Sequence, residues 1–106
     1  MRETLKAFYY HNSNLLVLKN ARDTRTGGTI INSATGTAQV LDRAMLPVTN
    51  GGPVALAYIA ASQGQYECTF SSLIDIPIGQ FVNIEVLMDG GTGLKYRGVI
   101  QAKVVA

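Results

Sequence analysis

Polar and apolar residues alternate along most of this chain, and almost no segment shows the period of about 3.6 residues that marks an amphipathic helix. A β-strand points successive side chains to opposite faces, so a period of two predicts strands with one buried face. Turn-forming residues separate the alternating segments at intervals of roughly 8 to 12 residues. We therefore expect about six or seven short strands packed as an all-β sandwich.

The alternation also predicts which side chains form the core. In the segment 66–70, Tyr66, Cys68 and Phe70 share the face that we expect to be buried. The phrase Gly-Gln-aromatic recurs at 79–81, but there the aromatic residue Phe81 falls in the outward phase. The buried series that follows it is Val82, Ile84, Val86 and Met88. The two phrases are therefore separate strand openings and not a repeat, and an outward Phe81 is either an ordinary exposed aromatic or an interface anchor.

Other segments give further strands. The run 14–20 is a short apolar strand, and the segment 29–42 carries small residues on one face, which favours a close approach by another strand. We expect 53–61 to be one edge strand that starts at Pro53. The last strand, within 93–105, should be half buried and half solvated. Its apolar face carries Leu94, Tyr96, Ile100, Ala102 and Val104, and its polar face carries Lys95, Arg97, Gln101 and Lys103.

The chain has 106 residues, which is the size of one domain. We assign residues 15–106 to a single β-sandwich and residues 1–14 to an N-terminal arm or first edge strand. This first part places Phe8, Tyr9 and Tyr10 in a row, and no single intramolecular surface of a strand buries all three. Two interpretations stay open: a first strand of the sandwich, or an extension that lies on a neighbouring copy.

Residues that could support catalysis or bind metal are few. One cysteine and one histidine cannot form a disulfide or supply a zinc ligand set, and Cys68 is best explained as a small core residue. The glycine-rich stretches at 24–29, 49–53 and 89–95 lack the Lys-Ser or Lys-Thr pair of a phosphate loop, so we interpret them as turns. The aspartates lie at turns; calcium binding by loop carboxylates stays open. We expect no enzyme activity and no cofactor.

Charge is distributed in blocks along the chain, although the net charge is only +2. Residues 1–43 carry a balance of +3, residues 44–94 a balance of −4 and residues 95–106 a balance of +3. The basic residues are scattered, which argues against nucleic acid as a partner. Solvated strand faces explain the blocks best, and head-to-tail association of copies is the alternative. The N-terminus lacks the features of a secretory signal, and no segment reads as a membrane-spanning helix, so we expect a chain made in a cytoplasm.

Three short motifs lie at the start of predicted strands. They are Asn32, Ala34 and Ala38 in an Asn-x-Ala-x-x-x-Ala strand, Gly64 and Tyr66 in a Gly-x-Tyr strand, and Ile76, Pro77 and Gly79 before the next strand. With these motifs the layout resembles the small immunoglobulin-like proteins of tailed bacteriophages and prophages. The similarity covers about residues 15–105. It departs from the pattern at Phe81 and Val82, where an aromatic usually points inward, and in the added N-terminal segment.

This resemblance implies an immunoglobulin-like antiparallel β-sandwich. It also implies a non-enzymatic structural protein of the virion, made in the host bacterial cytoplasm: a capsid decoration, head-tail connector or tail protein. The expected partners are major capsid or connector subunits and further copies of the chain, with no membrane. The expected interface residues are Phe8, Tyr9, Tyr10, Arg22, Arg25, Phe81, Lys95, Arg97 and Lys103. The alternative is an immunoglobulin-like module that binds carbohydrate or another host-surface partner.

Overall fold

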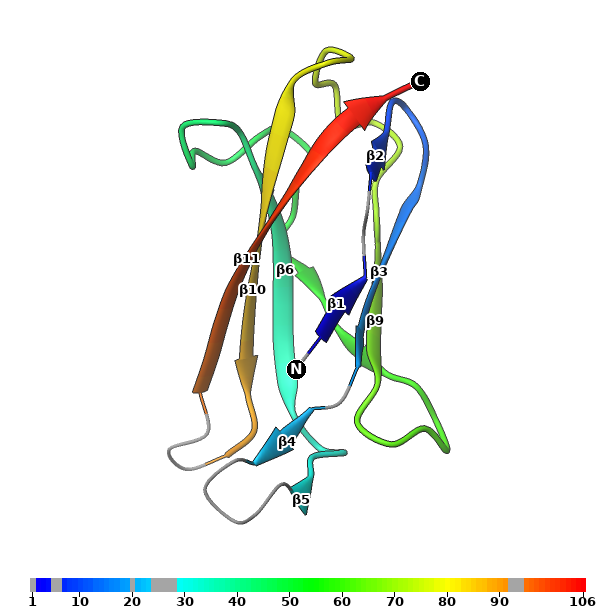
Figure 1. Cartoon of the computed structure of the whole chain (residues 1–106), viewed down its shortest axis with the longest axis vertical. Coiled ribbons are helices and arrows are strands. Elements are labelled where there is room, and N and C mark those ends of the chain that lie inside the picture. Colours follow the sequence, from blue (N-terminus) through cyan, green and yellow to red (C-terminus); the bar gives the residue numbers. More distant parts are fainter. Residues whose placement is uncertain (1, 5–6, 20, 24–28, 92–94) are drawn as a thin grey trace.

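Two β-sheets face each other in the computed structural model, which describes residues 2–4, 7–19, 21–23, 29–91 and 95–106 (Figure 1). The four-stranded sheet contains, in spatial order, β1 (Arg2–Thr4), β3 (Asn14–Lys19), β9 (Tyr66–Phe70) and β8 (Ala57–Tyr58). The five-stranded sheet contains β2 (Ala7–Tyr9), β11 (Lys95–Val105), β10 (Phe81–Asp89), β6 (Thr35–Leu41) and β7 (Val54–Ala55). A separate two-stranded ribbon pairs β4 (Arg22–Asp23) with β5 (Thr29–Ile30).

This strand order is that of an immunoglobulin-like sandwich: β1, β3, β9 and β8 correspond to strands A, B, E and D of that fold, and β6, β10 and β11 correspond to strands C, F and G. The predicted all-β sandwich is confirmed. The pairing is antiparallel except between β2 and β11, which run parallel. Within the described ranges, no helix is long and apolar enough to cross a membrane.

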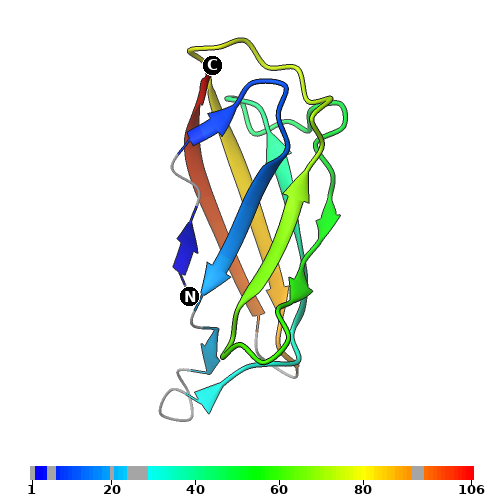
Figure 2. The same cartoon turned by 90° about the vertical axis from the view of Figure 1, so that its right-hand side faces the viewer.

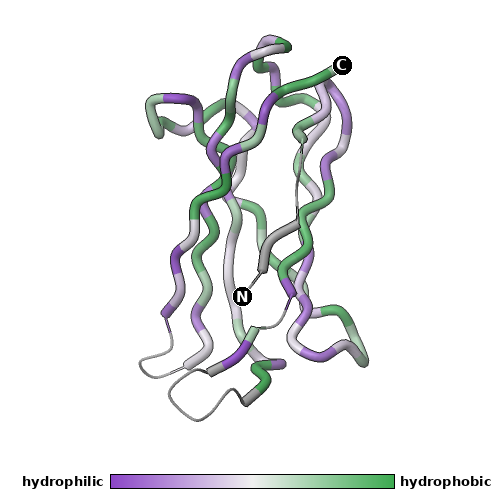
Figure 3. The backbone as a smooth tube through the Cα atoms, in the orientation of Figure 1, coloured by the Kyte–Doolittle hydropathy of each residue, from purple (hydrophilic) through white to green (hydrophobic). Residues whose placement is uncertain are grey.

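The core follows the predicted alternation. Tyr66, Cys68 and Phe70 of β9 are buried, as is the series from Val82 to Met88 in β10. Phe81 points outward and is 42% exposed. In β11, Ala102 and Val104 are buried while Lys95, Arg97, Gln101 and Lys103 are exposed. Polar and apolar colours accordingly alternate along the strands (Figure 3); of the expected apolar face of β11, Leu94 alone lies outside the described residues.

A segment that changes sheets runs along each side of the sandwich (Figure 2). At one side, β1 pairs with β3 in the four-stranded sheet and β2 pairs with β11 in the five-stranded sheet. At the other side, β7 pairs with β6 and β8 pairs with β9. The prediction of one continuous strand over 53–61 was therefore wrong. Leu56 lies between the two short strands with its side chain buried, and its N–H donates to the Gly36 carbonyl.

The hydroxyl of Tyr66 connects the two sheets inside the sandwich. It donates to the Ile31 carbonyl at 2.7 Å and accepts the Ala34 N–H at 3.0 Å, just before β6 begins. Nearby, the Asn32 side chain accepts the N–H of Gly64 at 2.9 Å. The residues of the Asn-x-Ala and Gly-x-Tyr motifs therefore hydrogen-bond to each other.

The small residues of β6 mark a close approach, as predicted. Gly36 lies opposite Met88 in the pairing of β6 with β10. A Cβ atom at position 36 would lie 2.5 Å from the Leu87 carbonyl oxygen and would also clash with the Met88 sulfur. Any side chain here would push the two strands apart.

Phe8 is a core residue and not an interface anchor, which corrects the sequence-based assignment. Its side chain is 2% exposed and lies 6.4 Å, between ring centroids, from Phe70. Asn14 fixes the following turn, because its side-chain oxygen accepts the Tyr9 N–H and its amide donates to the Tyr9 carbonyl. Within this chain, the N-terminal segment pairs with both sheets, β1 with β3 and β2 with β11.

We predict that Phe8→Ala lowers the free energy of unfolding by about 3 to 5 kcal/mol, the usual loss for a buried aromatic ring. Tyr9→Ala on the adjacent, half-exposed position should change it by no more than about 0.5 kcal/mol. Urea unfolding followed by circular dichroism measures both. Equal small effects would show that the segment does not belong to the core.

Candidate protein-interaction surface

The residues predicted to form an interface do not gather at one place. Phe8 is inside the core, and Arg25 lies outside the described residues. Arg22 is exposed on β4, at the end of the sandwich opposite to Tyr9 (Figure 1). Tyr9 is 51% exposed and Phe81 is 42% exposed, and both lie at the end where β2 stops and β10 starts.

Tyr10 is only partly exposed because it contacts other parts of the fold. Its ring packs against the core and stacks on the His11 ring, with centroids 4.2 Å apart. Its hydroxyl donates to Asp75 at 3.1 Å, and that bond raises the pKa of Tyr10. His11 lies 3.3 Å from the same carboxylate oxygen. Tyr10 therefore joins the β2–β3 turn to the β9–β10 loop.

The basic residues of β11 form ion pairs within the chain. Lys95 contacts Asp89 at 2.6 Å, and the hydrogen bond lowers the pKa of that carboxyl. Arg97 contacts Glu85 at 2.7 Å. Lys103 is exposed and lies opposite Phe81 in the strand register. Since exposed ion pairs contribute little to stability, these contacts mainly orient the cations along the sheet face.

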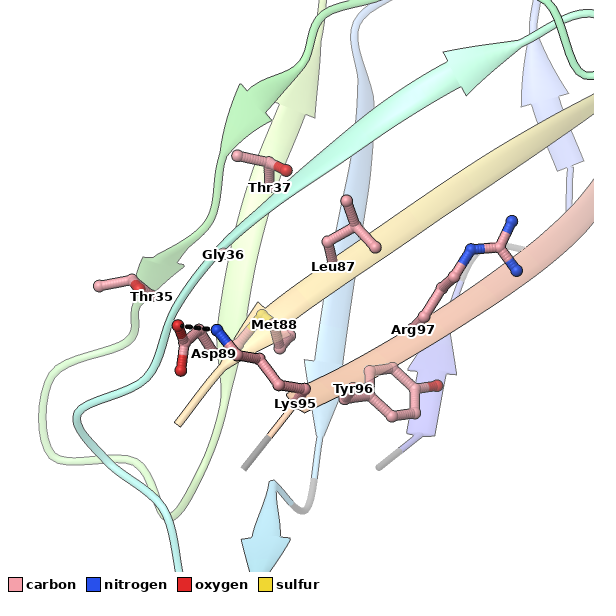
Figure 4. Close-up of a pocket in the computed structure, with 9 residues that line it drawn as sticks. All are labelled: Thr35, Gly36, Thr37, Leu87, Met88, Asp89, Lys95, Tyr96 and Arg97. Atoms are coloured by element: carbon pink, nitrogen blue, oxygen red, sulfur yellow. Dashed lines mark hydrogen bonds and ion pairs between the residues drawn. The ribbon is translucent and has the colours of Figure 1, made fainter. Parts of the chain in front are cut away.

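An open hollow of about 610 Å³ lies beside the Lys95–Asp89 pair (Figure 4). Thr37, Leu87 and Arg97 project on the same side of the sheet, whereas Met88 lies on the other side. The lining residues are Thr35, Gly36, Thr37, Leu87, Met88, Asp89, Lys95, Tyr96 and Arg97. This lining has neither a histidine nor a cysteine, and its one carboxylate, Asp89, is paired with Lys95.

The free thiol lies elsewhere. Cys68 is buried in β9, and burial raises its pKa to about 11, with Glu67 adding to the shift. A thiol with such a pKa is protonated at neutral pH and is a poor nucleophile. Among the described residues, no three His, Cys, Asp or Glu side chains are grouped as metal ligands.

Exposed apolar side chains gather at one end of the sandwich, which we call the apolar end. It comprises Tyr9, Phe81, the loop 42–53 and the loop 71–80 (Figures 1 and 2). Of the nine large hydrophobic side chains that are exposed in the described ranges, six belong to it. They are Tyr9, Met45, Leu46, Leu73, Ile78 and Phe81. The other three, Leu15, Leu87 and Val99, lie on strands.

A tight hairpin presents two of these side chains. Leu41 bridges to Pro47, and the Asp42 side chain accepts the N–H groups of Ala44 at 2.8 Å and Leu46 at 2.9 Å. Asp42 thus bonds its own turn, as the sequence predicts. Met45 at the tip has a φ of 64°, a conformation that non-glycine residues rarely adopt. Such a conformation persists only where the surroundings fix it.

The loop 71–80 presents two more of the exposed apolar side chains. Ile74 and Ile76 point inward and are buried, whereas Leu73 is 69% exposed and Ile78 is 54% exposed. The Gly79 N–H donates to the Val104 carbonyl at 2.8 Å, and the Leu73 N–H donates to the Ser71 hydroxyl at 3.0 Å. The exposed side chains are therefore held on an anchored frame.

Met45, Leu46, Leu73 and Ile78 were absent from the predicted interface. They lie in loops, and the alternation that marks strand faces does not report which loop side chains the core leaves uncovered. The one available signal was their composition, because large apolar residues in turn segments have no strand face to bury them.

No protein-family model, no curated protein and no solved structure matches this chain. The immunoglobulin-like fold itself serves many unrelated functions.

Proposed function

We propose that this chain is a non-enzymatic structural component of a phage virion: a capsid decoration, head-tail connector or tail protein. Its partners are major capsid or connector subunits, with further copies of the chain in the same particle. The observation that carries the proposal is the apolar end, where six exposed hydrophobic side chains lie on hydrogen-bonded loops. The sequence resemblance to phage immunoglobulin-like proteins supports the same class.

The shape of the chain favours attachment by one end. Its principal extents are 43 × 27 × 19 Å, and the apolar end lies at one extreme of the long axis (Figure 1). An end-on contact is small, so each copy binds weakly on its own. In a symmetric particle many identical contacts act together, and weak contacts then suffice for stable assembly.

Rigid display of the apolar side chains lowers the cost of such a contact. Immobilising a flexible side chain or loop on binding costs about 0.5 to 1.5 kcal/mol for each rotamer-rich side chain. Here the Asp42 hydrogen bonds and the buried Ile74 and Ile76 fix the two loops before any partner arrives. Exposed hydrophobic groups held in this way are typical of protein contact sites.

The double variant Leu46→Ser/Ile78→Ser should fail to enter virus particles, because it removes two apolar anchors from the apolar end. The test is co-sedimentation of the tagged chain with purified particles on a density gradient. We expect at least a tenfold loss of bound chain, roughly the effect of losing one or two interface hot spots. Leu87→Ser, on an exposed strand position toward the opposite end of the sandwich, is the control and should bind normally.

An equal loss in Leu87→Ser and in the double variant would contradict a contact through the apolar end. Absence of the wild-type chain from the particles would remove the virion proposal altogether. Thermal unfolding of each variant is the control for a retained fold.

A second candidate function is carbohydrate or host-surface binding, and one hollow favours it. About 460 Å³ in volume, it is lined by Arg43, Gly79, Gln80, Phe81 and Gln101. An exposed aromatic ring beside two amides can stack on a sugar and hydrogen-bond its hydroxyls.

For this alternative we expect a glycan-array signal that Phe81→Ala abolishes and Leu87→Ala leaves intact. An array on which no glycan binds the chain would contradict carbohydrate binding.

A further inference from the structure

The edge of β11 is largely unpaired. On one side, β10 pairs with β11 from Lys95 to Lys103. On the other side, the pairing with β2 covers only Lys103–Val105. Among the described residues, no other strand lies in register beside β11, since β1 belongs to the opposite sheet.

The backbone groups that point to this free side can be identified. Val104 donates its N–H to Gln80 and accepts from Gly79, so its polar groups face β10. The Val105 carbonyl instead accepts the N–H of Tyr10, on the β2 side. The backbone N–H and C=O groups of successive residues point to opposite sides of a strand. The groups of Arg97, Val99 and Gln101 therefore point away from β10, on the same side as those of Val105. They form a template for another strand.

The side chains on this edge carry charge of one sign. Lys95, Arg97 and Lys103 lie on the exposed face of β11, with Val99, 43% exposed, between them. If two copies paired through this edge, the basic side chains of both would lie in neighbouring columns, and like charges across a strand pair are destabilising. The cations thus disfavour self-association, as charges on edge strands commonly do.

The same cations suit an acidic strand. The Nε and one Nη atom of Arg97 contact the Glu85 carboxylate, and the ammonium of Lys95 donates to Asp89. A guanidinium has five N–H donors and an ammonium three, so each retains donors for a second carboxylate on the open side. An added strand would place its side chains directly opposite these cations, within reach of an ion pair.

We propose that the free edge of β11 binds an extended, antiparallel segment of a partner protein with acidic residues opposite Lys95 and Arg97 and an apolar residue opposite Val99. Main-chain hydrogen bonds to Arg97, Val99 and Gln101 provide the affinity, and the two cations select the partner. This site lies on the strand edge and not at the apolar end, so it can hold or fail independently of the function proposed above.

The test is a titration of the full chain, followed by amide NMR shifts, with the peptide acetyl-Thr-Val-Thr-Glu-Thr-Glu-Thr-amide. The matched probe replaces both glutamates with lysine. We expect the amides of Val99 and Gln101 to shift with the acidic peptide, which should bind at least about tenfold more tightly than the basic one. Equal binding of the two peptides, or no shift with the acidic peptide, would overturn the proposal.

The variant Val99→Pro separates strand addition from simple charge attraction. The Val99 N–H faces the open edge, so proline removes a donor that β10 does not use and is tolerated there. Val99→Pro should lose acidic-peptide binding, whereas Val99→Thr should bind within about threefold of the wild type. Unchanged binding by Val99→Pro would refute pairing through the backbone.

If Val99→Pro does not fold, Lys95→Gln/Arg97→Gln tests the same edge. We expect this double variant to weaken acidic-peptide binding at least about threefold, since two cross-strand charge pairs are lost. Unchanged affinity would overturn the assignment of the two cations.

Discussion

The buried hydroxyl of Tyr66 is the contact on which the arrangement of the two sheets depends. It joins β9 of one sheet to the Ile31 carbonyl and the Ala34 N–H, at the point where the chain enters β6 of the other. From there β6 runs in register with β10, and Gly36 allows the two strands to approach. A slip of one residue in β6 would turn its buried side chains outward. The Tyr66 contact thus helps to fix where β6 ends and where the hairpin 41–47 projects.

Two segments change sheets, one from β1 to β2 and the other from β7 to β8. Strands of only two or three residues border both sides of the sandwich, and edge strands this short are poor templates for another chain. The edge of β11 is the exception, and it carries cations. The first of the two segments brings Phe8 into the core and leaves Tyr9 outside, so neighbouring aromatics have opposite roles.

Much of this fold could be predicted from residue alternation, because a strand with one buried face records its environment in every second residue. Tyr66, Cys68 and Phe70 were predicted correctly on that ground, as was the outward Phe81. The sheet change at Leu56 could not be predicted, since a chain that crosses between sheets keeps the same alternation on both sides of the crossing. The burial of Phe8 was not predicted either, because three adjacent aromatic residues do not show which of them points to the core.

The candidate surface was predicted less well. Of the residues expected at an interface, Tyr9 and Phe81 lie at the apolar end, whereas Lys95 and Arg97 lie on the sheet face and already have partners within the chain. Loop residues such as Leu46 and Ile78 are exposed because the core beneath them is already filled by others, including Ile74 and Ile76. That outcome depends on the three-dimensional packing and is not encoded in a local pattern.

Attachment through the apolar end is tested most directly by hydrogen–deuterium exchange of the chain bound to the particle, compared with the free chain. We expect slowed exchange confined to the loops 42–53 and 71–80 and the neighbouring residues of β2 and β10. Protection centred instead on β4 and β5, at the opposite end, or spread evenly over both sheets, would contradict attachment through the apolar end.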